Sequence, residues 1–580
     1  MRGARQGIDD EGQRSGRIPF AFRIGITGHR ELSPAQVAQV RRRIPDVLDY
    51  VAGLVNPSIE TAVIITAISA LAEGSDRVVA EEILHTPHGR LEVVLPMPID
   101  EYVRKFSGQE SADEFRNLLR QARSVISGPR FDTVVDVEER EDVQYEWAGR
   151  EVARRCDMLL AVWDGKATRG RGGTAEIVRY SLESAIPVLY IPLDSGEIIT
   201  DEGRGHLASA FFAQSGFDRN AIETARGARE IPLDRTLRSY ARLDRYNKHR
   251  RLRFESDHSA VAHTTRERGV PKTRTSEGSP DGSDLGTVTG WIGPFYNWAD
   301  RRALFFHRWY AAGVLFIYGV AALAVLSASI GWITHSDSAF VAELVLLTLV
   351  LGATVLGRLL HLHDHWINSR SLAERLRSAV YLTAAGLGGA RDDENGTGDT
   401  HRSEDWMSRA FEFVWDFRPL VEVSDLANLR TFLAERWVEP QRRFFQDQAK
   451  RYSSRERRLL FASIGLFTAT FVVALLHVLD GSSRGSGSSH GTFAETTSIL
   501  AVSLPAFGSA MAAIAAHLQF HRHASVYADM VRQLGNLNGD LQQATSWHSV
   551  RRAAVQIDQV INSEQRDWVG AMRFYDLDLT

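Results

Sequence analysis

The sequence AAGVLFIYGVAALAVLSASIGWI (residues 311–333) and, after the turn THSDS (334–338), the sequence AFVAELVLLTLVLGATVLGRLL (339–360) decide how this chain folds. Each apolar run is long enough to cross the hydrocarbon core of a bilayer, about 30 Å, as a helix. The turn has no room for a folded domain, so both ends of this hairpin lie on one side of the membrane. Arginines flank the hairpin and none lies in the turn, which predicts cytoplasmic ends.

A second hairpin is predicted towards the C-terminus. Its apolar runs are residues 459–479 and 493–518, and several arginines flank it whereas its loop holds one. A hairpin followed by a long cytoplasmic helix therefore occurs twice, as an internal duplication. We expect four spans in the cell inner membrane with both termini in the cytoplasm. The alternative, a buried helical hairpin in a soluble core, is disfavoured by the length of the apolar runs.

Small residues recur at four-residue spacing within the spans, where they let helices approach closely in lipid. A proline in the fourth span should bend it and leave one backbone carbonyl without its helical donor. The positions predicted to control helix packing are Ala353, Gly357, Pro505, Gly508, Ala512 and Ala516.

The overall composition conceals these spans. The 580 residues carry a net charge of -4 and are 44% hydrophobic, which is typical of soluble multidomain proteins. Residues 1–17 are polar and basic, so we expect no signal peptide. The single cysteine, Cys156, excludes an intrachain disulfide and a cysteine-rich zinc site, and we expect neither a metal nor a tightly bound cofactor.

Residues 18–198 alternate strand and helix signals. Buried strands are predicted at residues 20–26, 62–69, 91–95, 158–162 and 188–191, and a capping box at Ser33 and Gln36 with Pro34 opens the first helix. This alternation predicts an α/β domain, a Rossmann-like, doubly wound parallel sheet. An all-α, four-span transmembrane region with long cytoplasmic helices follows it.

Three glycine-bearing loops follow three of these strands, at the edge of the sheet where such folds bind ligands. Their glycines allow close backbone approach, their arginines can pair with phosphate, and Thr174 is expected to cap the next helix. The candidate ligand-binding residues are Gly25, Thr27, Gly28, His29 and Arg30 in the first loop, Glu73, Gly74, Ser75, Asp76 and Arg77 in the second, and Trp163, Asp164, Gly165, Gly172, Gly173, Thr174 and Glu176 in the third.

These three loops resemble those of the SLOG superfamily, which includes LOG phosphoribohydrolases, the DprA-like fold and the sensor region of TRPM channels. LOG enzymes carry the motif PGGxGTxxE, whose glutamate takes part in cleavage. Here Arg171 replaces the proline, and Glu176 follows Thr174 by two residues instead of three. The resemblance therefore implies binding of a nucleotide or nucleotide-derived second messenger, and it leaves catalysis unsupported.

The remaining regions are assigned as follows. Residues 199–257 read as a helical extension and residues 258–290, rich in Ser, Gly and Asp, as a flexible linker. The basic cluster 248–251 lacks interleaved aromatic residues, so we expect a solvated or lipid-facing surface and no nucleic-acid partner. Residues 291–390 and 404–580 each resemble SLATT, a two-span membrane effector domain, and the AERLR sequence at 373–377 is the local feature that carries this resemblance.

The resemblances imply a sensor of a nucleotide-derived signal coupled to a membrane-disrupting or pore-forming effector, a homo-oligomer that acts in bacterial anti-phage defence. Two alternatives stay open. One is a membrane-tethered, LOG-like nucleotide N-glycosidase that uses Glu176 or Glu73. The other is a constitutive ion channel with a TRPM-like sensor.

Overall fold

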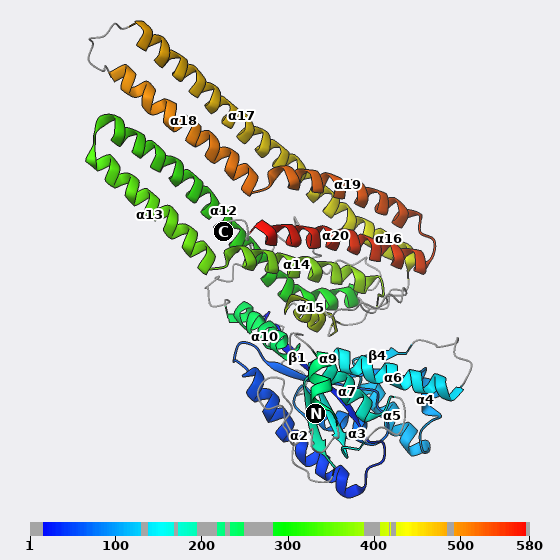
Figure 1. The fold of residues 1–580 in the computed structure, drawn as a ribbon. Coiled ribbons are helices and arrows are strands. Elements are labelled where there is room, and N and C mark those ends of the chain that lie inside the picture. The colour runs from blue at the N-terminus through cyan, green and yellow to red at the C-terminus, as the bar shows by residue number, and fades with distance from the viewer. Residues whose placement is uncertain are drawn as a thin grey trace. The chain divides into compact units, whose positions relative to one another are not determined.

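The computed structural model describes residues 16–128, 137–166, 172–193, 217–226, 232–248, 282–387, 406–416, 418, 425–483 and 492–575. The chain forms two compact units (Figure 1). The first contains residues 1–255 and 391–418, and the second contains residues 256–390 and 419–580. Each unit is described by itself.

The first unit is built on a six-stranded, fully parallel sheet with strand order β4-β3-β2-β1-β5-β6. The strands are β1 (Phe20–Gly28), β2 (Val63–Ser69), β3 (Arg90–Leu95), β4 (Ser124–Ser127), β5 (Met158–Trp163) and β6 (Val188–Pro192). The five predicted strands are present. Strand β4 was not predicted, because this edge strand has only four residues, alternately half-buried and exposed, and so gives no buried apolar run.

Helices cover both faces of this sheet, which confirms the doubly wound α/β fold. The helices are α2 (Pro34–Val55), α3 (Ser75–His85), α4 (Ile99–Val103), α5 (Gln109–Gln121), α6 (Val137–Arg155), α7 (Thr174–Glu183), α9 (Arg219–Arg226) and α10 (Pro232–Lys248). The connections from β1 to β4 run in one direction across the sheet and the later ones return, so right-handed crossovers place α2 and α3 on one face and α6 and α7 on the other. The predicted capping box is formed by Ser33 and Gln36.

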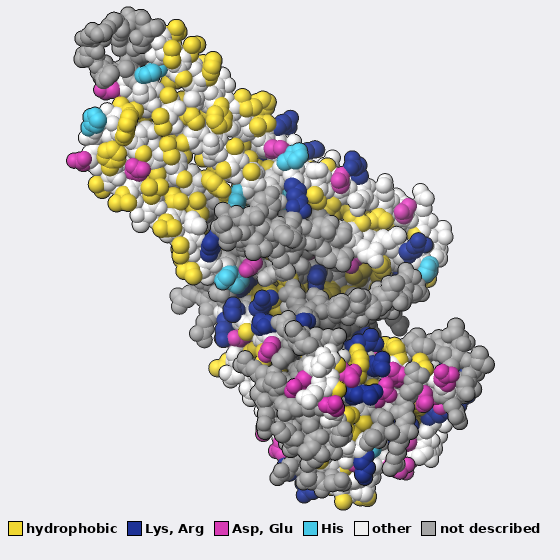
Figure 2. Space-filling model, in the orientation of Figure 1, with side chains coloured by type: hydrophobic (Ala, Val, Ile, Leu, Met, Phe, Trp, Pro, Cys, Tyr) yellow, Lys and Arg dark blue, Asp and Glu magenta, His cyan; other side chains and the backbone are white. Residues whose placement is uncertain are grey.

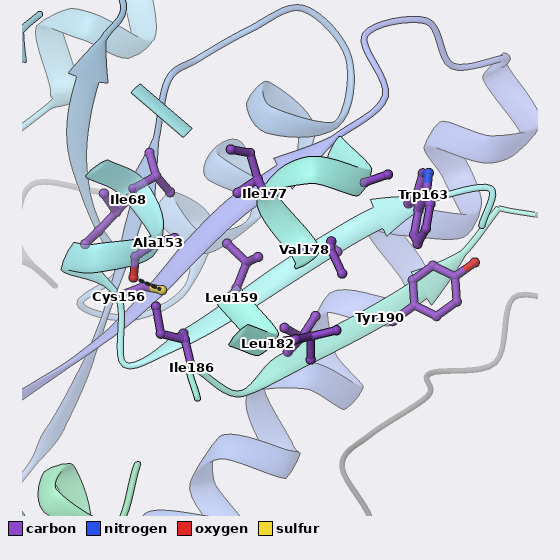
Figure 3. Close-up of a cluster of buried hydrophobic side chains, with 14 of the residues drawn as sticks. Ile68, Ala153, Cys156, Leu159, Trp163, Ile177, Val178, Leu182, Ile186 and Tyr190 are labelled. Atoms are coloured by element: carbon purple, nitrogen blue, oxygen red, sulfur yellow. Dashed lines mark hydrogen bonds between the residues drawn. The ribbon is translucent and has the colours of Figure 1, made fainter. Parts of the chain in front are cut away.

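The core beneath α7 shows why the strands β5 and β6 carry continuous apolar runs. All six residues of β5 and all five of β6 are buried. In Figure 3, Leu159, Val178, Leu182, Ile186 and Tyr190 form one cluster between these strands and α7. Parallel strands buried on both faces lose the alternation of polar and apolar residues.

The first unit also contains a helix from a distant part of the sequence. Helix α15 (Trp406–Asp416) packs on β1 and α10. This location differs from the expected boundary, which assigned residues from 404 onwards to the second membrane repeat. The next helix, which begins at Leu426, is capped by Asp425, whose carboxylate accepts hydrogen bonds from the backbone N–H groups of Ala427 and Asn428.

The second unit is entirely helical in the part of the chain that the structure describes. Its elements are α12 (Gly282–Thr334), α13 (Asp337–Leu359), α14 (Leu362–Ala384), α16 (Leu426–Phe432), the π-helical turn η2 (Leu433–Val438), α17 (Glu439–Ser483), α18 (Thr492–His517), α19 (Phe520–Gln543) and α20 (Trp547–Tyr575). One further expected boundary is corrected. The expected linker at 258–290 ends earlier, since α12 begins at Gly282.

Four stretches in this unit are long and apolar enough to cross a membrane, and they include α12, α13, α17 and α18. Their apolar side chains face outwards, as the yellow surface of Figure 2 shows over these helices. Helix α13 buries no residue, and Phe461 and Phe471 on α17 are each 69% exposed. Soluble monomers rarely expose apolar patches this continuous, so these surfaces are suited to lipid.

The internal duplication is visible in the backbone. Helix α13 passes into α14 through His361, and α18 passes into α19 through Gln519, and both residues have left-handed backbone conformations with φ of 45° and 50°. Each half therefore consists of a long helix, a membrane-length helix and a third helix that follows the same left-handed corner. The spans of each hairpin also contact each other, α12 with α13 and α17 with α18.

The AERLR sequence (residues 373–377) lies at a contact between the two halves of this unit. Glu374 is 3% exposed and pairs with both Arg370 and Arg377. The Arg377 guanidinium also donates to the side-chain oxygen of Gln441 on α17, over 3.2 Å. These contacts link α14 of the first half to the second half through buried polar groups.

Candidate functional site

The first and third glycine loops meet where the strand connections reverse direction. Strands β1 and β5 are neighbours in the sheet, although their outgoing connections lie on opposite faces. His29 follows β1 and Asp164 follows β5, and the His29 Nε2 atom lies 3.0 Å from the Asp164 Oδ1 atom. In open parallel sheets this topological switch point is the usual ligand crevice. The structure therefore brings these two predicted residues together.

The Asp164 carboxylate is held in its ionised form. Burial alone would raise its pKa, but hydrogen bonds from Lys166 and His29 outweigh burial and lower the pKa. The same His29 Nε2 atom is also 3.2 Å from the backbone nitrogen of Asp164. His29 therefore faces both a carboxylate and a peptide N–H group at the edge of the sheet, and Gly165 continues this loop with φ of 77°.

The second glycine loop packs directly on the first. Ser75 donates its backbone N–H and its hydroxyl to the carbonyl oxygen of His29, over 3.0 and 2.9 Å. Gly74 has φ of 81°, and a Cβ atom there would lie 2.2 Å from the Arg30 carbonyl oxygen. A Cβ atom on Gly28 would similarly lie 2.6 Å from the Cβ atom of Ser75. Glycine is therefore required at both positions by the close approach of two loops.

Two other residues predicted for the first loop lie within β1. Thr27 pairs with Ala161 of β5, and Gly25 pairs with Leu159. A Cβ atom on Gly25 would lie 2.8 Å from the Cβ atom of Cys156, so this glycine allows β1 to pass the end of α6. These residues shape the strand that carries His29.

Arg77 does not face the crevice as the sequence analysis expected. It is 2% exposed, and its guanidinium donates to the carbonyl oxygens of Leu71 and Ser111 and pairs with Glu114 over 2.8 Å. Asp76 is also buried, and it accepts a hydrogen bond from Ser69 over 2.9 Å. Burial raises the pKa of Asp76 to about 6, although its hydrogen bonds oppose this shift. Both side chains stabilise the loop from inside.

Glu73 is likewise engaged by the protein. Its Oε1 atom accepts hydrogen bonds from the backbone N–H and the hydroxyl of Ser107, over 2.8 and 2.7 Å, and from the Ser111 hydroxyl. Burial opposes the charge, but these hydrogen bonds lower the pKa of Glu73. A carboxylate held in this way is a poor general acid, because a general acid needs a raised pKa.

Arg30 is a cationic residue beside the crevice. Its guanidinium lies over the ring of Tyr145 on α6, 4.6 Å from the ring centroid. Burial lowers the pKa of Arg30, but its interactions with Tyr145, Tyr102 and Asp76 together outweigh burial and the net shift is upwards. Sequence reasoning missed Tyr145, since it lies in the middle of a polar helix and not in a glycine loop. Tyr145 could have been identified from its position in the helix that precedes β5, because that helix crosses the sheet towards the switch point.

The third loop is organised by Glu176. This carboxylate accepts the backbone N–H of Gly172 over 2.8 Å and lies 3.4 Å from Arg150 on α6. Gly172 has φ of 75°, and a Cβ atom there would lie 2.6 Å from the backbone nitrogen of Glu146. Glu176 therefore closes the glycine turn against α6.

Two further expectations for the third loop are corrected. Thr174 is the first residue of α7 and not its cap, because the cap is Gly173, which offers no side-chain hydrogen bond. Trp163 is 2% exposed and packs on Tyr190, with ring centroids 5.8 Å apart, so it belongs to the core. The N-termini of α3 and α7 thus both begin at glycines without side-chain caps. Backbone N–H groups at such ends favour anions.

The small residues of the spans differ in what they contact. A Cβ atom on Gly508 would lie 3.2 Å from the Phe467 ring of α17, and the Ser463 hydroxyl donates to the Gly508 carbonyl oxygen over 3.0 Å. Gly357 has open space around its Cα atom, and Ala512 and Ala516 are exposed. Pro505 lies inside α18 without ending it. Gly508 therefore serves packing within its own hairpin.

Comparisons with known proteins add no relative. No model of a protein family, no curated protein and no solved structure matches the chain. The function is therefore inferred from the residues and from their placement within each unit.

Proposed function

We propose that this chain is a sensor of a nucleotide-derived signal joined to a membrane-disrupting or pore-forming effector, which acts in bacterial anti-phage defence. One observation carries the proposal. His29, Asp164 and Arg30 lie together at the switch point of a parallel sheet, in a chain that also has four membrane-length apolar helices. A ligand crevice and a lipid-facing bundle in one chain are the two parts that such a sensor requires.

The chemistry of the crevice favours a phosphorylated, aromatic ligand. Arg30 can pair with phosphate, and the N-terminus of α7, which has no side-chain cap, offers backbone N–H groups and a positive helix-dipole end. Tyr145 offers an aromatic face, and Asp164 can accept hydrogen bonds from hydroxyl or amino groups. A nucleotide carries all of the complementary groups.

Binding fits this site better than cleavage of an N-glycosidic bond. Both carboxylates considered for catalysis, Glu73 and Glu176, accept backbone N–H groups and stabilise their loops. An N-glycosidase would need one of them free to act on the substrate. The nucleotide therefore acts as a signal and not as a substrate.

The membrane part of the proposal follows from the spans. The arginines that flank both hairpins support cytoplasmic termini for a chain that we propose lies in the cell inner membrane. In this orientation the ligand crevice faces the compartment where nucleotides are made. A homo-oligomer would supply the spans of a pore, and the exposed apolar side chains of the four membrane-length helices offer surfaces for its subunits and for lipid.

The test uses the full-length protein in lipid vesicles loaded with a fluorescent dye. A panel of mono-, di- and cyclic nucleotides is added, and binding and dye release are measured together. We expect one class of nucleotide to bind and to change dye release at least tenfold. Arg30→Ala should weaken this binding, while Arg116→Ala, which removes an exposed arginine from the same unit, should not.

Two results would contradict the proposal. Conversion of a bound nucleotide to free base would instead establish the N-glycosidase. Dye release that is rapid without any nucleotide and unchanged by all of them would establish the constitutive channel.

A further inference from the structure

Helix α15 connects the two units in a way that neither the loops nor the spans reveal. It packs on the sheet of the first unit, yet its sequence lies between α14 and α16, which belong to the second unit. Residues 385–405 precede it and residues 417–425 follow it. The nine residues after Asp416 span at most about 35 Å when fully extended, so a large displacement of α15 must also move α16.

The docking surface for α15 is a buried, charged patch at the amino ends of the strands. Asp157, which immediately precedes β5, is 1% exposed. Arg409 of α15 donates to both carboxylate oxygens of Asp157, over 2.6 and 3.1 Å, and also to the hydroxyl of Thr236 on α10. Arg409 therefore neutralises a carboxylate that has no access to water.

A second ion pair fixes the next turn of α15. Glu412 accepts a hydrogen bond from the Arg23 guanidinium over 2.9 Å, and Arg23, which is 5% exposed, also lies 3.5 Å from Glu92 on β3. The Arg90 guanidinium lies over the ring of Phe413, 5.4 Å from its centroid. Residues of β1, β3, β5 and α10 thus hold α15 through charges as well as apolar contacts.

The strands that hold α15 are the strands that form the ligand crevice. At their amino ends, the Arg23 backbone N–H donates to Asp157 over 2.9 Å, and Arg409 joins the same carboxylate. At their carboxyl ends, His29 pairs with Asp164. Strands β1 and β5 therefore run directly from one contact to the other.

Isolated helices as short as α15, with 11 residues, are marginal in water. Its helical form therefore depends on docking, and two charge-assisted contacts control that docking. A ligand that changes the relative position of β1 and β5 changes the affinity of the sheet for α15, and by linkage a released α15 changes the affinity for the ligand.

We propose that α15 is a coupling helix, whose docking on Asp157 and Arg23 conveys the state of the switch-point crevice to both membrane hairpins. This inference rests on the proposed function for its physiological role, but docking and its effect on the second unit are independent of any ligand. The position of α15 between the two hairpins in the sequence means that its release frees the chain on both sides at once.

The test compares Arg409→Ala with the matched control Arg116→Ala in the full-length protein in lipid vesicles. Amide hydrogen exchange is measured for residues 406–416 and for α14 and α16, and dye release is measured without nucleotide. We expect Arg409→Ala to speed exchange in α15 at least tenfold, to speed exchange in α16, and to change basal dye release at least threefold. The control should match the wild type.

Each outcome decides the matter. If α15 exchanges faster while α16 and dye release match the wild type, α15 is only a structural part of the first unit and the inference is wrong. If Arg409→Ala changes both exchange in α16 and basal dye release, but no nucleotide binds the wild type, the coupling by α15 is supported and the proposed ligand is wrong. Arg409→Ala could also destabilise the whole sheet, which would speed hydrogen exchange in all of its strands. In that case Glu412→Ala, which leaves Asp157 paired with Arg409, provides the same test.

Discussion

The Nε2 atom of His29 lies 3.0 Å from the Oδ1 atom of Asp164, although 135 positions separate the two residues in the chain. The pair spans the carboxyl ends of β1 and β5, the two strands at which the connections of the sheet reverse direction. The charge on the Asp164 carboxylate therefore affects the edge of the sheet where we propose that a ligand binds.

Asp164→Asn should weaken this pair. The pKa of Asp164 is lowered in the folded protein, so its contribution to stability is present above its unfolded pKa and is lost as the pH falls through the folded value. We expect the variant to lose about 1 kcal/mol of unfolding free energy at pH 7 and little below pH 3. Amide hydrogen exchange of β1 and β5 measures this difference. An equal loss at both pH values would show that the charge is not responsible.

Asp76 should have the opposite pH dependence. Burial raises its pKa to about 6 in the folded protein, so the folded state binds a proton that the unfolded state releases near pH 4. Stability should fall by about 2 kcal/mol as the pH rises from 4 to 6.5. Asp76→Asn should remove this slope, as measured by exchange of β2 amides. A slope that persists in the variant would assign it to other groups.

Arg30 and Arg77 should separate binding from stability. Arg77→Ala removes a buried guanidinium with several hydrogen bonds, and we expect a loss of about 3 kcal/mol in the stability of the first unit. Arg30→Ala should change stability by less than about 1 kcal/mol and weaken binding of a nucleotide by roughly 1.5 to 3 kcal/mol. Thermal unfolding and titration calorimetry measure the two effects. The reverse assignment would move the ligand site into the α3 loop.

The difference between these two arginines shows how far the sequence could be interpreted. Glycine and arginine after a buried strand predicted a loop at the ligand edge, and both loops are there. Whether the arginine faces solvent depends on Ser111 and Glu114 of α5, which sequence spacing cannot place. The same limit hid α15, because its apolar composition fits a membrane-proximal helix equally well. Its contacts with the sheet, among them the pairing of Arg409 with Asp157 and of Glu412 with Arg23, assign it to the first unit.

A truncated chain that ends at residue 256 should therefore be less stable than the intact first unit. It lacks α15, so Asp157 loses both hydrogen bonds from Arg409 while remaining among buried groups. We expect a melting temperature at least 5 °C lower than that of the same chain with residues 404–418 fused through a glycine-serine linker. A fused chain that carries Arg409→Ala is the control, and it should resemble the truncated one. Equal melting temperatures for all three would mean that α15 contributes nothing to the sheet.

Gly508 and Ala512 should respond differently to leucine, because they face different surroundings. A side chain at Gly508 meets the Phe467 ring within the same hairpin, so Gly508→Leu should separate α17 from α18 and reduce protection of both helices against hydrogen exchange. Ala512 is exposed within the chain, so Ala512→Leu should leave the hairpin intact. If α18 packs between subunits, Ala512→Leu lowers the oligomeric state in detergent by light scattering and reduces dye release. If the oligomer and the release both match the wild type, subunits meet on another surface, and Gly357→Leu on the open face of α13 tests that surface in the same assay.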